Sequence, residues 1–311
     1  MHNVLVTGGA GFIGRQVVKR LSEKGYRVIV IDNLSNKKCI CNYNNNILLN
    51  NKISFYKEDI RNKASISHII KQESVDTCIH LAAKVSVYDS IRNPNDTIDV
   101  NFKGTLKLLE ACYSNKVKNF LFASSAAVYG EPKNLPLSED DTLEPLSPYG
   151  LSKVSAERLI STYKKLGKIQ NAVSLRLFNV YGKSEDVINV FAQRLSKGLP
   201  PVIYGDGQQI RDFISLNDVV NAITLAAEQS SKISSGVFNI GTGTPTTINE
   251  LAQKMIKIFD LVLEPIYCEA NNGDIKYSYA NVTRAKKILK FIAADNFESN
   301  LKQMLYDFKC H

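Results

Sequence analysis

The sequence predicts an α/β fold in which a doubly wound parallel sheet is joined to a smaller mixed α/β lobe. Over the first 178 residues, short apolar runs alternate with amphipathic stretches, and each run is apolar throughout. Continuously apolar strands are typical of parallel sheets covered on both faces, and strand–helix alternation produces right-handed βαβ units. After residue 178 the alternation is lost, which predicts the second lobe.

The expected elements follow one another in order. Buried strands are expected at residues 4–7, 27–31, 53–56, 77–82, 120–124 and 173–177. Amphipathic helices are expected at residues 13–24, 64–72, 94–114 and 148–166. The asparagine-rich segment 42–51 is too polar for a core element, and we expect a surface loop there.

In the second part, glycine and proline clusters at 198–201, 205–207 and 241–245 mark loops. Helical periodicity returns at 216–228, 248–259 and 282–289. We therefore predict a first domain of residues 1–178, rejoined by segment 212–240. Residues 179–211 and 241–311 are expected to form the lobe.

Composition is typical of a soluble cytoplasmic protein, with 44% hydrophobic and 22% charged residues among 311. No apolar run reaches the length of a membrane span, and a strand is expected almost at the N-terminus, so neither a membrane segment nor a leader is predicted. The six cysteines are scattered, and Cys39 and Cys41 are too close for a usual zinc site, so reduced thiols and no metal are expected.

The formal charge of +9 suits an anionic ligand such as a nucleotide. Nucleic acid is a second reading of this charge, but it requires a clustered basic face with stacking aromatic side chains. The basic residues are dispersed and the 14 tyrosines are not interleaved with them, so no nucleic-acid partner is predicted.

A glycine loop lies between the first expected strand and helix. Gly8 would allow a tight turn, Gly11 would let the backbone approach a pyrophosphate, and Gly14 would permit close helix–strand packing. The following helix would offer its free N–H groups and positive dipole end to phosphates. Because it stands between a strand and a helix, the pattern predicts a dinucleotide site.

Asp32 ends the second expected strand, 18 residues beyond Gly14. A carboxylate there can accept hydrogen bonds from both ribose hydroxyls and repels a 2′-phosphate, which favours NAD over NADP. The alternative is a turn or cap residue. Asp59 and Ile60 follow the third strand and could hold the edge of the adenine ring.

Tyr149 and Lys153 are four residues apart at the start of an expected helix, so both lie on one face. A lysine ammonium beside a phenol favours the phenolate and lowers its pKa, which makes tyrosine a usable base. The alternative, a solvated helix face, is the more common origin of this spacing by itself.

Together these features identify a family. The chain resembles the extended short-chain dehydrogenase/reductases and, among them, the UDP-sugar 4-epimerases. The resemblance rests on the glycine loop, Asp32, the Tyr149/Lys153 pair, and the segments 80–83, 124–130, 175–182 and 205–213, and it covers essentially the whole chain.

The resemblance implies a Rossmann fold and assigns roles to individual residues. Ser125, Tyr149 and Lys153 would be catalytic, with Ser124 on the opposite face of its strand. NAD would contact Gly8, Gly11, Phe12, Ile13, Asp32, Asn33, Ser35, Asn36, Asp59, Ile60, Leu81, Ala82, Ala83, Asn101, Tyr149, Lys153 and Phe178. A UDP-sugar would contact Ser86, Ser125, Asn179, Tyr204, Arg211, Asp274 and Ser278. For Arg211 the alternative is a salt bridge to Asp212 or Asp218, and for Asn179 it is a turn at the strand end.

The implied reaction is 4-epimerisation through a transient 4-keto sugar, with Tyr149 as base and NAD retained between turnovers. Related 4,6-dehydratases carry an acid and a base, and decarboxylases a glutamate, at positions occupied here by Ala126 and Ala127. Alanine cannot transfer a proton, so simple epimerisation is favoured.

The sugar is indicated by one residue. The family's gate position, four after a Gly–Asp pair, is Ser278, and a small residue there leaves room for a 2-acetamido group. This favours UDP-N-acetylglucosamine/UDP-N-acetylgalactosamine over UDP-glucose/UDP-galactose. Asn271 and Asn272 stand where many relatives have a diphosphate-binding arginine, which leaves UDP-glucuronate open.

Two further readings keep the fold but change the function: a non-catalytic NAD-sensing protein, and an alcohol dehydrogenase that releases NADH. The presence of Tyr149 and Lys153 argues against the first. The resemblance also implies a homodimer through the helices expected at 94–114 and 152–166.

Overall fold

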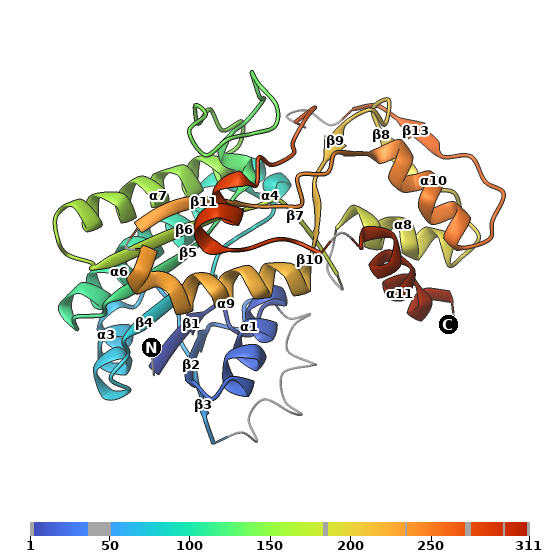
Figure 1. Ribbon diagram of the computed structural model, residues 1–311. Helices are drawn as coiled ribbons and strands as arrows, with labels where there is room; N and C mark the ends of the chain where they lie inside the picture. The colour runs from blue at the N-terminus through green and yellow to red at the C-terminus, as the bar shows by residue number, and fades with distance from the viewer. Residues whose placement is uncertain are drawn as a thin grey trace.

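The computed structural model describes residues 3–36, 51–182, 186–233, 235–270, 275–294 and 296–309 (Figure 1). Its centre is a seven-stranded sheet in the order β11-β6-β5-β4-β1-β2-β3, and every neighbouring pair is parallel. The strands are β1 (Asn3–Thr7), β2 (Arg27–Asp32), β3 (Ile53–Lys57), β4 (Thr77–His80), β5 (Asn119–Ser125), β6 (Asn171–Leu177) and β11 (Ser235–Ile240).

Helices cover both faces of the sheet (Figure 1). On one face, α1 (Phe12–Glu23) and α9 (Leu216–Ile233) bury Val17, Leu21, Val219 and Ile223 against the strands. On the other face, α3 (Lys63–Gln72), α6 (Thr105–Ser114) and α7 (Pro148–Lys165) contribute to a second apolar core. The predicted doubly wound fold is confirmed.

The strand order determines where a ligand can bind. The chain runs from β1 to β2 and β3 on one side, and the next strand, β4, pairs with the other side of β1. A crevice outside the carboxyl ends is the usual ligand site at such a reversal. The strands ending at this edge place Thr7, Asp32, His80, Ser125 and Leu177 along it.

The smaller lobe lies to one side of the sheet (Figure 1). Its short strands pair as β7 with β10, β9 with β12, and β8 with β13, and its apolar core includes Phe191, Phe213 and Met255. Its elements are β7 (Asn179–Tyr181), α8 (Val187–Leu195), β8 (Val202–Tyr204), β9 (Ile210–Arg211), β10 (Phe213–Ser215), β12 (Thr246–Thr247), α10 (Ile248–Ile258), β13 (Ile266–Cys268) and α11 (Phe297–Lys309).

Several elements differ from the sequence prediction. The helix expected at 94–114 is divided into α5 (Pro94–Ile98), the π-helical η1 (Asp99–Gly104) and α6. The strand expected at 77–82 ends at His80, and most of the helix expected at 282–289 is the π-helical η3 (Ala285–Leu289). α4 (Val87–Arg92), α8 and α11 were not predicted, nor was η2 (Ala126–Val128). Residues 42–50 of the asparagine-rich segment lie outside the described residues.

Among the described helices, none combines the length and apolar character needed to span a membrane.

Candidate active site

The glycine loop brings backbone close to the carboxyl edge of the sheet. Gly8 has φ +70°, and a Cβ added there would lie 2.6 Å from the Ala82 nitrogen. A Cβ on Gly14 would overlap the Gly8 carbonyl oxygen, so the loop and α1 can pack this closely only without side chains. Gly11 is the N-cap of α1 and offers no side-chain acceptor to the first N–H groups. This cradle fits the pyrophosphate of a dinucleotide.

Asp32, at the end of β2, accepts hydrogen bonds from the glycine loop and from the turn that follows β2. One carboxylate oxygen accepts a hydrogen bond from the Ala10 nitrogen at 3.0 Å, and the other accepts one from the Leu34 nitrogen at 2.8 Å. The residue therefore has the turn role that was the alternative reading, while it lies beside the glycine loop where a ribose would bind.

Neighbouring residues of the expected adenosine site are also ordered by hydrogen bonds. The Asn33 amide donates to Asp59 at 2.9 Å, and the Ser35 nitrogen donates to the Asn33 side chain at 3.0 Å. Hydrogen bonding from Arg61 holds the pKa of Asp59 well below its usual range. The side chain of Ile60 packs in the core, so only its backbone is available at the adenine edge.

A buried polar chain runs beneath the loop at residues 81–83. The Thr7 hydroxyl lies 2.7 Å from His80 Nδ1, and His80 Nε2 lies 2.9 Å from the Thr105 hydroxyl, which donates to the Asn101 carbonyl at 2.6 Å. Since Thr105 uses its proton for Asn101, His80 donates from Nε2 and accepts at Nδ1. Burial lowers the pKa of His80 to about 3, and the charge of Lys153 acts in the same direction, so the imidazole is neutral.

Asn101 lies in the π-helical turn η1 and connects these buried polar residues to α7 by hydrogen bonds. Its side chain accepts from the Lys84 nitrogen at 2.7 Å and donates to the Lys84 carbonyl at 2.9 Å and the Ser152 hydroxyl at 3.0 Å. Ser152 in turn donates to the Tyr149 carbonyl at 2.7 Å. A π-turn re-aims a helical side chain and is frequent at functional sites; here it fixes the expected nicotinamide-side loop against α7.

The predicted catalytic residues come together at the end of β5. Ser147 caps α7 by accepting from the Gly150 nitrogen at 3.1 Å, and Pro148 occupies the first turn. Tyr149 and Lys153 are both buried on this helix. Lys153 Nζ donates to the Ala123 carbonyl at 2.8 Å and lies 5.8 Å from the centroid of the Tyr149 ring.

The pKa of Tyr149 differs from the sequence expectation. In the cofactor-free chain burial raises the pKa of Tyr149, and a hydrogen bond with Ser125 opposes this. Lys153 does not lower it, because burial lowers the pKa of Lys153 itself to about 7 against an opposing effect of Glu157. The spacing of Tyr149 and Lys153 predicted a lowered tyrosine pKa, and this direction was wrong, because burial outweighs the neighbouring groups.

Successive serines at the end of β5 have different partners, as alternation along a strand requires. Ser124 donates to Glu157 in the interior, while Ser125 accepts from the Ala127 nitrogen at 3.2 Å and lies on the Tyr149 side. Ala126 and Ala127 form the 3-10 turn that follows.

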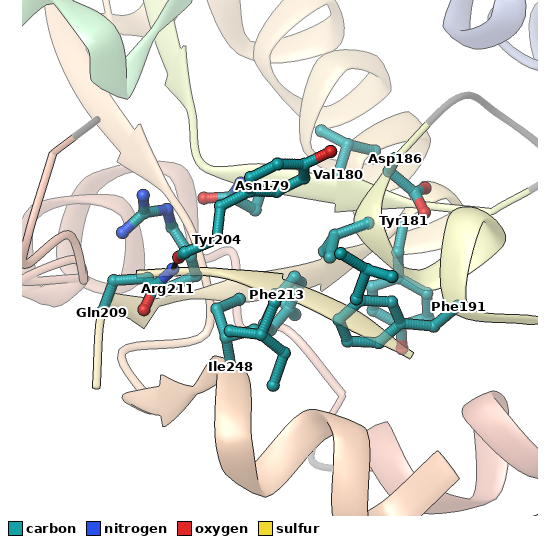
Figure 2. A pocket seen from close by; sticks show the side chains of 13 residues that line it. Asn179, Val180, Tyr181, Asp186, Phe191, Tyr204, Gln209, Arg211, Phe213 and Ile248 are labelled. Atoms are coloured by element: carbon teal, nitrogen blue, oxygen red, sulfur yellow. Dashed lines mark hydrogen bonds between the residues drawn. The ribbon is translucent and has the colours of Figure 1, made fainter. Parts of the chain in front are cut away.

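A cavity of about 290 Å³ lies in the smaller lobe, and three of the predicted substrate residues line it: Asn179, Tyr204 and Arg211 (Figure 2). Its apolar wall includes Phe191, Phe213 and Ile248, and Asp186 and Gln209 also face it. Ser125 pairs with Leu177 in the sheet register, and β7 begins at Asn179. The first cavity residue therefore follows two positions after Leu177, which ends the strand next to Ser125.

Ser278, the residue predicted to act as a gate, lies beside β9, the strand that carries Arg211. It is buried, and its nitrogen donates to the carbonyl of Ile210 at 3.0 Å, next to Arg211. Asp212 is fully buried and accepts hydrogen bonds from Thr242, Gly243 and Ala280. Asp218 accepts from Ser215 at 2.7 Å. Asp274 lies outside the described residues, as do Asn271 and Asn272.

Comparison with known proteins decides the family. The sequence profile of the NAD dependent epimerase/dehydratase family matches residues 4–241. This chain belongs to that family. The expectations of an enzyme, of NAD as cofactor and of an epimerase-type short-chain dehydrogenase/reductase are confirmed.

Relatives of this family member match it over nearly its whole length. A putative UDP-glucose 4-epimerase of Methanocaldococcus jannaschii is 39% identical over 292 residues, covering 92% of each chain. The UDP-glucose 4-epimerase of Thermotoga maritima, solved with UDP-glucose, has a TM-score of 0.89 and 36% identity and covers 99% of both chains. The UDP-N-acetylglucosamine 4-epimerase of Methanobrevibacter ruminantium, solved with UDP-N-acetylmuramic acid, has a TM-score of 0.88 and 35% identity over 99% of this chain and 98% of that one.

The remaining predicted residues of this epimerase/dehydratase lie around the same edge. The Phe12 ring lies beside Gly182, and Ile13 packs against the core. Phe178 is buried, and the centroid of its ring lies 6.5 Å from the centroid of the Tyr129 ring. Ser86 caps α4 by accepting from the Asp89 nitrogen at 3.0 Å, and Asn36 also makes contacts.

Sequence reasoning missed three residues of the site: Asp186, Gln209 and Glu157. Asp186 caps α8 by accepting from the Asn189 nitrogen at 2.9 Å, and an Asp directly before the apolar run that starts at Val187 is a cap signal that could have located that helix. Nothing in the sequence pattern points to Gln209 as a cavity residue. Glu157 lies one turn after Lys153, a spacing that was readable.

Proposed function

We propose that this protein catalyses the NAD-dependent 4-epimerisation of a UDP-hexose through a transient 4-keto sugar. The observation that carries the proposal is the adjacency of two sites. Tyr149, Lys153 and Ser125 meet at the carboxyl edge of the sheet, and Asn179 of the cavity follows two residues after Leu177, the strand partner of Ser125. A nucleotide held in the cavity would place its sugar at the hydroxyl groups.

The chemistry follows from these side chains. Tyr149, as phenolate, would take the proton of the sugar 4-hydroxyl, and Ser125 would hydrogen-bond the same oxygen. NAD, held by the glycine loop and Asp32, would supply the hydride acceptor that epimerisation at C4 requires. Lys153, on the same face of α7, would hold the nicotinamide ribose, and in its protonated form it would stabilise the phenolate.

Nothing in the turn after Ser125 provides a second acid or base. Ala126 and Ala127 occupy η2 and carry methyl groups only. Elimination of water and decarboxylation both need a further proton-transfer group at this place, whereas epimerisation needs only the tyrosine, the serine and the hydride acceptor.

In the cavity, Tyr204 and Arg211 would bind different parts of the nucleotide. The Tyr204 ring is half-exposed at the rim, where it could stack on uracil (Figure 2). The guanidinium of Arg211 presents a fixed fork of donors that matches diphosphate oxygens. Asn179 would contact the sugar diphosphate from the start of β7.

For the sugar we propose UDP-N-acetylglucosamine and UDP-N-acetylgalactosamine. Ser278 is small and buried beside Ile210, next to Arg211, so it leaves room where a tyrosine would not. The name of the M. ruminantium relative supports this choice. UDP-glucose is the second candidate, supported by the names of the other two relatives. UDP-glucuronate is the third, because its carboxylate would suit the positive charge of the chain.

Separate incubations of the purified protein with UDP-N-acetylglucosamine, UDP-glucose and, if neither reacts, UDP-glucuronate, at first without added cofactor, test the proposal. We expect conversion of both sugars, with the acetamido sugar preferred. Ser278→Tyr should abolish conversion of the acetamido sugar and spare UDP-glucose, while Ser278→Ala, the matched control, should keep both activities. Equal loss of both activities in Ser278→Tyr would reject the gate. Failure of wild type on all three sugars, even with NAD added, would reject the function.

We also propose a homodimer through the helices α5, α6 and α7. Tyr113 on α6 and Leu151 on α7 are about half-exposed and could be covered in this way. Light scattering should give about twice the 34.6 kDa of one chain; the mass of a single chain would exclude the dimer.

A further inference from the structure

Glu157 is a buried carboxylate one helical turn beyond Lys153, and it takes no part in the chemistry described above. It is 7% exposed and accepts hydrogen bonds from three donors. Arg176 Nε donates to one oxygen at 3.0 Å and Arg176 Nη2 donates to the other at 2.7 Å. The third donor is the hydroxyl of Ser124, the residue before the catalytic serine.

Arg176 is equally well paired. It is 3% exposed on β6, and its remaining Nη1 donates to the Tyr129 hydroxyl at 2.9 Å and the Glu139 carbonyl at 3.1 Å. Tyr129 then donates to the Asn239 side chain at 2.5 Å. The Glu157–Arg176 pair thus connects the catalytic helix to β5, β6 and β11 with its hydrogen bonds satisfied.

A buried ion pair is weak evidence for stability, because desolvation of both charges offsets their attraction. This pair has a different relation to the site. Glu157 is four residues from Lys153 on the same face of α7, and Ser124 is adjacent to Ser125. Glu157 therefore accepts a hydrogen bond from Ser124, which stands between Ala123, whose carbonyl accepts from Lys153, and Ser125.

We infer that Glu157 is a positioning residue for the proposed reaction: balanced by Arg176, it orients α7 against β5 and sets the charge that Lys153 and Tyr149 experience. This inference rests on the proposed function for its kinetic readout. Glu157 touches neither substrate nor cofactor and acts through the lysine, the tyrosine and the strand that carries Ser125.

Few other charges face Lys153. On α7 the ionisable neighbours are Tyr149 and Glu157; β4 presents the neutral His80, and β6 presents Arg176 behind Glu157. β5 carries no ionisable side chain. On the other elements packed against α7, charged groups pair with one another nearer the surface: Lys84 with Asp96, Asp99 with Arg61 and Lys103, and Lys63 with Glu110. Asp89 and Arg92 on α4 are exposed.

The sign of the effect follows from this arrangement. The charge of Glu157 raises the pKa of Lys153. Glu157→Gln removes that charge and leaves the guanidinium of Arg176 uncompensated, so Lys153 and Tyr149 should both lose their protons at lower pH. The active state carries one proton on the pair, so the acid limb of activity reports the more acidic group, Lys153, and the alkaline limb reports Tyr149. Both limbs of the profile of kcat/KM should therefore move down by about one pH unit.

Three variants separate charge from structure. Glu157→Gln should shift both limbs, and the charge-neutral double variant Glu157→Gln/Arg176→Met should return them to within a few tenths of a pH unit of wild type. Ser124→Ala removes one hydrogen bond to Glu157 without changing charge, and its limbs should stay in place. A purely structural role would lower the rate at every pH and leave the limbs unmoved. Unshifted limbs in Glu157→Gln, or an unrestored profile in the double variant, would overturn the inference.

A second readout is independent of the reaction. Calorimetric titration of NAD into the cofactor-free protein should show affinity falling as Lys153 loses its proton, and this transition should occur at lower pH in Glu157→Gln than in wild type. An identical transition in both proteins would overturn the inference. If wild type converts no UDP-sugar, the proposed function fails, and the NAD titration still decides the role of Glu157.

Discussion

Replacement of Lys153 by methionine should stabilise the cofactor-free protein while it abolishes activity. Lys153 is buried, and burial lowers its pKa from 10.5 to about 7. Between these two values the unfolded chain binds a proton that the folded chain does not, so folding is penalised. Methionine fills a similar volume and has no charge to desolvate.

The magnitude follows from the two pKa values. The interval from 10.5 to about 7 corresponds to about 5 kcal/mol against folding when the pH is below 7. As the pH rises from 7 to 9, about 2 kcal/mol of this penalty is relieved. Loss of the hydrogen bond from Lys153 to the Ala123 carbonyl costs about 1 kcal/mol in the variant. Near pH 7 the variant should therefore be more stable by about 3 kcal/mol.

Urea unfolding of both cofactor-free proteins from pH 6 to 9 measures this difference. The difference in unfolding free energy should be greatest near pH 6 and should shrink steadily toward pH 9, because wild type gains stability as Lys153 becomes neutral. Titrations shared by the two proteins cancel in the difference. A difference that is constant over this range, or a variant less stable than wild type throughout, would refute the reasoning.

Three further substitutions probe the rest of the site. Tyr149→Phe should lower kcat by about 10²-fold or more with the circular dichroism spectrum and NAD content unchanged; activity near wild type would exclude this base. Asp32→Asn keeps an acceptor for the Leu34 nitrogen but removes the charge, so NADP affinity relative to NAD should rise by about tenfold or more in calorimetric titrations, whereas an unchanged ratio would contradict a ribose-side position. Gly14→Ala places a Cβ on the Gly8 carbonyl and should cost about 2 kcal/mol or more in urea unfolding and reduce bound NAD, whereas Gly198→Ala, whose Cβ meets nothing within 4 Å, should keep its NAD.

The sheet and its cofactor edge were predictable because each strand is a long apolar run and each motif is a short stretch of consecutive residues at a strand end. Each central strand is a continuous apolar run, and the glycine loop and Asp32 stand at strand ends where the parallel order brings them together. The family resemblance singled out Ser125, strand alternation put Ser124 on the opposite face, and the structure gives the two serines different partners.

The smaller lobe was not predictable in detail. β9 and β12 are two residues each, and β7, β8, β10 and β13 are three, so none is long enough to show a periodicity. The π-turn at Asp99–Gly104 differs from an α-helix by one inserted residue, and the apolar spacing in the sequence does not show where that residue is. Sequence-based placement of Asp186 and Gln209 fails because the cavity is formed by tertiary contacts between such elements.

The electrostatics required the structure as well. The spacing of Tyr149 and Lys153 predicted a lowered tyrosine pKa, but burial of both groups reverses the direction in the cofactor-free chain. Whether desolvation or a neighbouring charge dominates depends on exposure, which sequence spacing does not report. Glu157 lies on α7 and its partner Arg176 lies on β6, so sequence spacing could not reveal this pair either.

The most direct test of the central claim is the fate of the hydrogen at C4. UDP-N-acetylglucosamine labelled with deuterium at C4 would be incubated with the purified protein in ordinary water, without added NAD, and both epimers would be examined by mass spectrometry and NMR. The account predicts that the label is retained at C4 in both epimers, because the hydride leaves and returns within one site. Conversion accompanied by loss of the label to solvent would contradict it.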